Sequence, residues 1–187
     1  MPGADASPGF SPTIRRLHLL VALLVTLQIL LGLVMNRDTP RLFLGHQYLG
    51  LAIVTLVLIH WLWLVTRERT QLAHLFPLES KYRQAVLRDL AGLRHGREPE
   101  TGPRPGLPAL IHGLGLLALT LVAALGAAIF VLIQRGTVRS PAGEAITDLH
   151  IFFAWVLIIY WVGHVLLAGI HELRGERVIA RMFSPRR

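Results

Sequence analysis

Four long apolar runs constrain the fold of this chain more than any other feature. They cover approximately residues 17–35, 42–65, 107–133 and 146–170. A helix needs about 20 apolar residues to cross the hydrocarbon core of a bilayer, and each run is long enough. The sequence therefore predicts an all-α integral membrane protein, folded as a bundle of four transmembrane helices.

The segments outside these runs divide the chain simply. Residues 1–13 are rich in Pro, Gly and Ser and predict a disordered tail, residues 14–173 form one membrane domain, and residues 174–187 are a basic tail. The 66–106 loop has Tyr82, Val86, Leu90 and Leu93 at helical spacing. This spacing predicts an amphipathic helix over about residues 80–95, lying on the inner membrane surface.

The net charge of +8 follows the topology of a membrane protein rather than nucleic-acid binding. Fifteen of the 19 Lys and Arg residues precede the first span, lie between spans two and three, or follow the fourth, and four lie in the other two loops. Cytoplasmic loops carry the excess of positive charge. We therefore expect both termini in the cytoplasm, membrane lipid as a partner and no nucleic-acid partner.

Histidines recur at matching depths in the second and fourth spans. His46 and His60 are fourteen residues apart, and so are His150 and His164. Fourteen residues of α-helix rise about 21 Å in nearly four full turns, so both imidazoles look out of one face, one near each edge of a core about 30 Å thick. Ionisable side chains inside a span usually mark a functional site. The matched spacings predict two stacked ligand positions, which two haems would fit.

The outer position has two candidate ligands, His46 and His150. The inner position has four: His18, His60, His112 and His164. Small residues one turn after a ligand let a porphyrin approach the ligand's own helix, whereas Leu64 and Leu116 follow His60 and His112 at that spacing. The residues followed there by Ala or Gly are His18, His46, His150 and His164. This favours His18 with His164 inside and leaves His60 as the alternative.

The chain has no cysteine. This excludes disulfides, thiolate-held iron–sulfur clusters and covalently attached c-type haem, so any haem is bound non-covalently. Iron held by two histidines has no open position for oxygen, and its chemistry is electron transfer.

Several of these motifs resemble the prokaryotic cytochrome b561 family, which is related to the cytochrome b subunits of hydrogenase and formate dehydrogenase. The resemblance covers roughly residues 15–187. It rests on Arg15–x–x–His18, on the HQYLG segment from His46 to Gly50, on the pair His150 and His164, and on the basic tail. The resemblance implies two haem b groups, held by His46 with His150 outside and by His18 with His164 inside. Arg15 and Arg16 are then the candidates for pairing with propionates.

Two positions depart from the family pattern. Leu19 stands where many members have Trp, and His60 stands where many have Arg. His60 is therefore either a replacement for His18 as the inner ligand or a hydrogen-bond donor to a propionate.

Three functions remain open. The first is an oxidoreductase that passes electrons from a small outer donor, such as superoxide, to ubiquinone, with His171 at a quinone site near the inner headgroups. Short outer loops containing Arg37, Arg41, Arg135 and Arg139, which attract an anion, favour it. The second is a membrane-anchor cytochrome b subunit of a periplasmic enzyme or of a cytochrome c partner. The third is a haem-free bundle that moves protons or metal ions through its histidines.

Overall fold

The computed structural model describes residues 11–36, 38–97, 99, 104–175 and 179. This part of the chain forms six helices and no strand. The helices are α1 (Pro12–Val34), α2 (Pro40–Arg67), α3 (Arg69–Leu75), α4 (Ser80–Arg94), α5 (Leu107–Gln134) and α6 (Pro141–Leu173). Four of them, α1, α2, α5 and α6, are long and apolar enough to cross a membrane. The predicted all-α membrane architecture with four spans is confirmed.

The spanning helices are delimited by proline and serine as well as by apolarity. Each has Pro in its first turn, where the fixed φ of proline suits a helix and its missing N–H is not needed. The Ser11 hydroxyl accepts from the N–H of Ile14, and the Ser140 hydroxyl from that of Gly143. These caps start α1 and α6 five residues before the predicted spans. The predicted tail over 1–13 is therefore too long, since α1 begins at Pro12; residues 1–10 lie outside the described residues, as does most of the predicted 174–187 tail.

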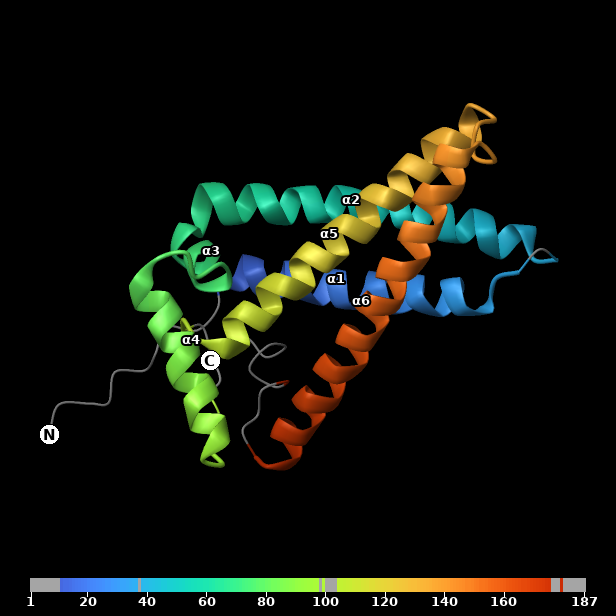
Figure 1. The fold of residues 1–187 in the computed structure, drawn as a ribbon. Coiled ribbons are helices and arrows are strands. Elements are labelled where there is room, and N and C mark those ends of the chain that lie inside the picture. The colour runs from blue at the N-terminus through green and yellow to red at the C-terminus, as the bar shows by residue number, and fades with distance from the viewer. Residues whose placement is uncertain (1–10, 37, 98, 100–103, 176–178, 180–187) are drawn as a thin grey trace, which may run out of the picture.

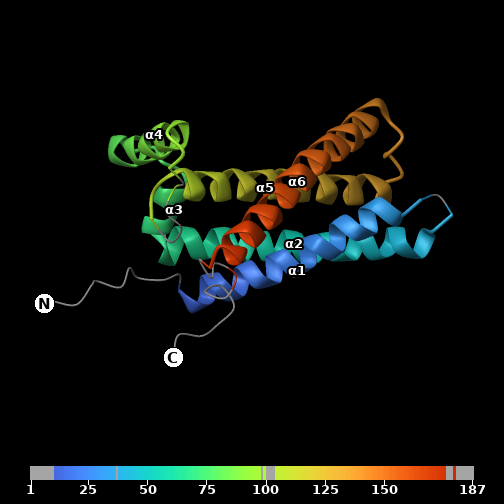
Figure 2. The same ribbon diagram turned by 90° about the horizontal axis from the view of Figure 1, so that it is seen from below.

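The four spans form two antiparallel hairpins. In Figure 1, α1 lies along α2, whereas α5 and α6 adjoin at the connection between them and diverge from there; α5 also packs against α2. The start of α1, the end of α2, helices α3 and α4, the start of α5 and the end of α6 gather at one end of the bundle, which we call the α4 end. The short connections 35–39 and 135–140 form the opposite end, the turn end. Figure 2 shows the same separation from below, with α3 and α4 beside the start of α5.

A small core joins all four spans. Its buried members are Val25 of α1, Ile53 and Val57 of α2, Leu119 of α5 and Leu157 of α6. Lipid chains are as apolar as these side chains, so close packing and hydrogen bonds between helices must supply much of the association free energy.

Two such hydrogen bonds join the hairpins. The indole of Trp61 on α2 donates to Thr120 on α5 at 2.9 Å, and the indole of Trp161 on α6 donates to Thr26 on α1 at 3.2 Å. Each threonine hydroxyl in turn donates to the carbonyl one turn earlier in its own helix. The two tryptophans therefore link the first hairpin to the second on both sides of the bundle.

Helix α4 runs across the direction of α1 and α2 (Figure 1). Ala85 and Val86 are buried, whereas Leu90 and Leu93 of the predicted apolar face are 42% and 45% exposed. The face that packs on the protein is thus only part of the apolar face, and its contact with the membrane surface stays a prediction. The helix begins at Ser80, with Glu79 in the N-cap position.

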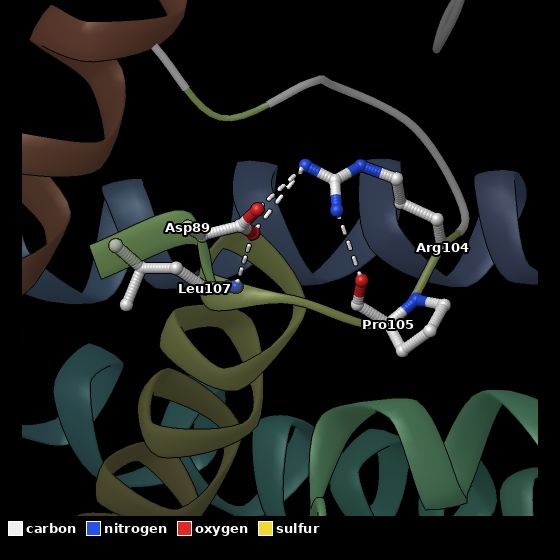
Figure 3. A network of polar contacts seen from close by, with 4 residues as sticks. All are labelled: Asp89, Arg104, Pro105 and Leu107. Atoms are coloured by element: carbon white, nitrogen blue, oxygen red, sulfur yellow. Dashed lines mark hydrogen bonds and ion pairs between the residues drawn. The ribbon is translucent and has the colours of Figure 1, made fainter. Parts of the chain in front are cut away.

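A carboxylate from α4 holds the start of α5. Asp89 accepts from the backbone N–H of Leu107 at 2.8 Å and forms an ion pair with Arg104 at 3.2 Å, as Figure 3 shows. Arg104 also donates to the carbonyl of Pro105 at 3.0 Å. Gly106, the N-cap residue of α5, has φ 151° and offers no side chain of its own, so Asp89 supplies the acceptor that a capping residue usually gives.

Candidate functional site

The outer histidine pair lies near the turn end. His46 of α2 and His150 of α6 face each other with ring centres 6.5 Å apart and ring planes inclined at 88°. The pair therefore joins the second helix of each hairpin.

Each imidazole of the outer pair lies against a glycine of its own hairpin. A methyl group built on Gly32 of α1 would be 3.4 Å from Cε1 of His46, and one built on Gly126 of α5 would be 3.2 Å from Cε1 of His150. Larger side chains would displace the rings. The sequence reasoning missed both glycines, because it considered only small residues on the ligands' own helices.

Hydrogen bonds fix the surroundings of this pair. Nδ1 of His150 lies 3.1 Å from the carbonyl oxygen of Val122, and the Gln28 amide donates to the carbonyl of His46 at 3.0 Å. If Nδ1 of His150 carries the proton, Nε2 keeps its lone pair for a metal, which is the usual arrangement for a ligating histidine. Gln28 and Val122 lie one turn before the two glycines, so both hairpins hold their histidine from equivalent positions.

The inner pair lies in the α4-end half of the bundle. His18 of α1 and His164 of α6 have ring centres 6.1 Å apart and planes inclined at 68°. Two further rings contact His164: His112 of α5 at 5.0 Å, nearly perpendicular, and Tyr160 at 5.7 Å, nearly parallel. Within the described residues His60 makes no ring contact with these three histidines, and its buried Nδ1 has no hydrogen-bond partner.

Both facing pairs fit a metal bound between two imidazoles. Such a pair has ring centres about 6.2 Å apart, because a metal–imidazole bond measures about 2.0 Å and the nitrogen lies about 1.1 Å from its ring centre. The two measured separations lie on either side of this value. Among the described residues no group of three or more His, Cys, Asp or Glu side chains is arranged to hold a metal ion. A pair without a third protein ligand suits haem, whose porphyrin supplies the other four donors, better than tetrahedral zinc.

The remaining predicted residues lie at the same end as the inner pair. Arg15 is half-buried and Arg16 exposed in the first turn of α1, just before His18. His171 is half-buried on the last turn of α6, two turns beyond His164. The structure thus gathers these predicted residues around one end of the bundle.

The two hairpins share a pattern of residues, of which the fourteen-residue spacing of histidines in the second and fourth spans is only one part. His112, Thr120 and Gly126 of α5 follow His18, Thr26 and Gly32 of α1 at one constant offset. A second constant offset relates the two histidines of α6 to those of α2. Comparing the first and third spans would have revealed this, and with it the two glycines.

Comparison with known proteins shows a family relationship. The family model described as prokaryotic cytochrome b561 matches residues 9–185. No curated protein and no solved structure matches the chain.

Proposed function

Because the chain belongs to the prokaryotic cytochrome b561 family of membrane b-type cytochromes, we propose that it holds two haem b groups between its facing histidine pairs and carries electrons across the membrane. The observation that carries this proposal is the pair of imidazole separations, 6.1 Å and 6.5 Å, in opposite halves of one bundle. His150 and His164 are fourteen residues apart on α6, which places the two sites about 21 Å apart along that helix.

The chain's own residues would do three things at each site. His46 with His150, and His18 with His164, would fill both axial positions and exclude oxygen from the iron. Gly32 and Gly126 leave the outer imidazoles room, and the carbonyl of Val122 orients His150. When bound, haem supplies a one-electron couple, and closed axial positions restrict it to electron transfer.

Positive charge lies beside the inner site. Arg15, one turn before His18, and Arg16 are our candidates for pairing with propionates of the inner haem. His60 is the alternative inner ligand and otherwise a hydrogen-bond donor to a propionate. Arginine suits the first role because its guanidinium binds carboxylates in a bidentate manner.

Electrons would run from an outer donor to quinone at the α4 end. This follows if the chain lies in a bacterial inner membrane with both termini in the cytoplasm, as the distribution of basic residues favours. Ubiquinone would be reduced near His171, at the headgroup level. Superoxide is a suitable donor because the turn end exposes Arg41 in the first turn of α2 and Arg135 and Arg139 on the short 135–140 connection; Arg37 lies outside the described residues.

The second candidate function is a membrane-anchor subunit that receives electrons from a periplasmic enzyme or a cytochrome c. The family's relationship to such subunits favours it, whereas the short turn-end connections offer a large partner little surface. Isolation from native membranes would separate the two, since an anchor subunit carries a stoichiometric partner with it. A haem-free transporter would show no haem absorption at all.

Reconstitution tests the proposed direction. Purified protein in quinone-containing liposomes is exposed to enzymatically generated superoxide on the turn-end side. We expect haem reduction followed by quinone reduction, and slower quinone reduction with normal haem spectra for His171→Ala. Reduction of haem by superoxide without any electron reaching quinone would contradict the proposed acceptor, and absence of haem reduction would contradict the donor.

A further inference from the structure

Tyr160 is the aromatic neighbour of the inner pair. It lies one turn before His164 on α6, with ring centres 5.7 Å apart and planes only 14° apart. A parallel, offset ring at this distance restricts rotation of the imidazole about its Cβ–Cγ bond, because it occupies space that a turned ring would need.

His164 needs such a neighbour more than His150 does. Nδ1 of His150 is held by the carbonyl of Val122 at 3.1 Å. For His164, the described residues provide contacts with the rings of His18, His112 and Tyr160 but no hydrogen-bond partner. Its ring plane is therefore set by packing alone.

Gly115 leaves the space that the Tyr160 ring occupies. Gly115 of α5 is buried, and a methyl group at this position would overlap Cζ, Cε1 and the hydroxyl of Tyr160. The absence of a side chain at 115 thus lets the phenol ring lie between α5 and α6 while its face stays against His164.

This arrangement breaks the pattern shared by the two hairpins. The positions that correspond to Tyr160 and Gly115 in the first hairpin hold Leu56 and Val21. His60, the counterpart of His164, therefore has no tyrosine one turn before it. His60 and His164 occupy equivalent positions, but only His164 has a stacked ring beside it. His164 is also the one whose ring lies next to that of His18.

We propose that Tyr160, seated on Gly115, is a positioning residue that fixes the plane of the His164 imidazole at the inner haem iron. The inference rests on the proposed function. In the ferric low-spin state, the angle between two axial imidazole planes governs the anisotropy of the electron paramagnetic resonance signal. The observed angles of 68° and 88° are both near perpendicular, which produces strongly anisotropic signals.

Four variants of the haem-loaded protein test the proposal. Tyr160→Leu removes the stacked ring and should shift and broaden the inner signal and change the inner midpoint potential. Tyr160→Phe retains the ring and should restore the wild-type signal. Gly115→Ala keeps the ring but displaces it and should shift the inner signal less than Tyr160→Leu does. Leu56→Ala, the matched control beside His60, should shift nothing.

The outer signal serves as an internal reference in every variant. Wild-type inner signals in both Tyr160→Leu and Gly115→Ala would overturn the proposal, and so would equal shifts in Tyr160→Phe and Tyr160→Leu. If Tyr160→Leu lost the inner haem, Gly115→Ala would decide by its signal alone. Wild-type protein without two low-spin signals would instead contradict the proposed function.

Discussion

His18 and His60 both lie in the inner half of the bundle, but only His18 has its ring facing His164. We therefore expect His18→Ala to lose the inner haem or to leave it five-coordinate, because an axial position opens. His60→Ala should keep a six-coordinate spectrum and at most shift the potential. Reduced-state absorption spectra of the two variants measure this. The reverse outcome would move the inner site onto α2 and α6.

At Gly126 the outer pair leaves little room for a side chain, because a Cβ there would be 3.2 Å from Cε1 of His150. Gly126→Val should push the His150 ring away from His46 and lower the haem content from two per chain toward one, with the inner haem retained. Haem content per protein measures the loss. Gly169→Val is the matched control, because the Cβ position of Gly169 has nothing within 4 Å. Equal haem content in the two variants would show that the space beside His150 is not needed.

The histidines could be found from the period of a single helix, whereas their neighbours on other helices could not. A histidine in an apolar run is conspicuous because its polar ring is costly there, and helix geometry alone relates His150 to His164. The contacts of Gly32, Gly126 and Gly115 depend on where a second helix crosses, which no single-helix period encodes. The apolar runs contain many small residues, so composition did not single these out.

At the scale of elements, Asp89 connects α4 to α5. Asp89→Ala removes the acceptor for the Leu107 N–H and the ion pair with Arg104, and we expect it to destabilise the protein by about 1–2 kcal/mol. Each kcal/mol lowers the Tm of a chain of this size by about 2–4 °C. Asp89→Asn keeps an acceptor oxygen and should lose less. Thermal unfolding of the detergent-solubilised variants tests the order, which a Tm for Asp89→Ala equal to that of the wild type would contradict.

His74 connects α3 to α4 and makes their packing sensitive to pH. Burial, and then the charge of Lys81, hold the pKa of His74 below its ordinary value of 6.5. The folded state thus binds fewer protons than the unfolded state, so stability is complete above about 6.5 and falls as the pH drops through the folded pKa.

We expect His74→Phe, which keeps a ring against Tyr82, to lose less stability between pH 7.5 and 5.5 than the wild type does. Thermal unfolding at both pH values measures the difference. The effect should be small, because His74 is only partly buried and solvent screens its charge. An identical change in Tm for the two proteins would contradict the role of His74.

The number of spanning helices could be predicted from the sequence, but the residues at which they begin and end could not. Apolar length predicts four spans because a bilayer has a fixed thickness, but the helices continue into polar residues wherever Pro and Ser provide a start, as at Ser140 and Pro141. The short helix α3 carries too few residues for a period to emerge. The buried face of α4 depends on its contact with α5, which its amphipathic pattern alone does not specify.

Across the whole molecule, two hairpins with the same arrangement of residues hold four facing histidines on opposite halves of the bundle. The outer pair joins corresponding positions of α2 and α6, whereas the inner pair joins α1 to α6. The inner pair is therefore asymmetric, and Tyr160 lies against its α6 member, His164. Under the proposed function α6 supplies a histidine to each haem, and the electron route would follow this helix.

Haem stoichiometry tests this account most directly. Protein expressed with ample haem and purified in mild detergent is assayed as the pyridine haemochrome, with protein concentration from amino-acid analysis. Two facing histidine pairs predict a value near two haem b per chain, and near one after His46→Ala or His18→Ala. A wild-type value near one would remove one of the two sites, and a value near zero would contradict the account.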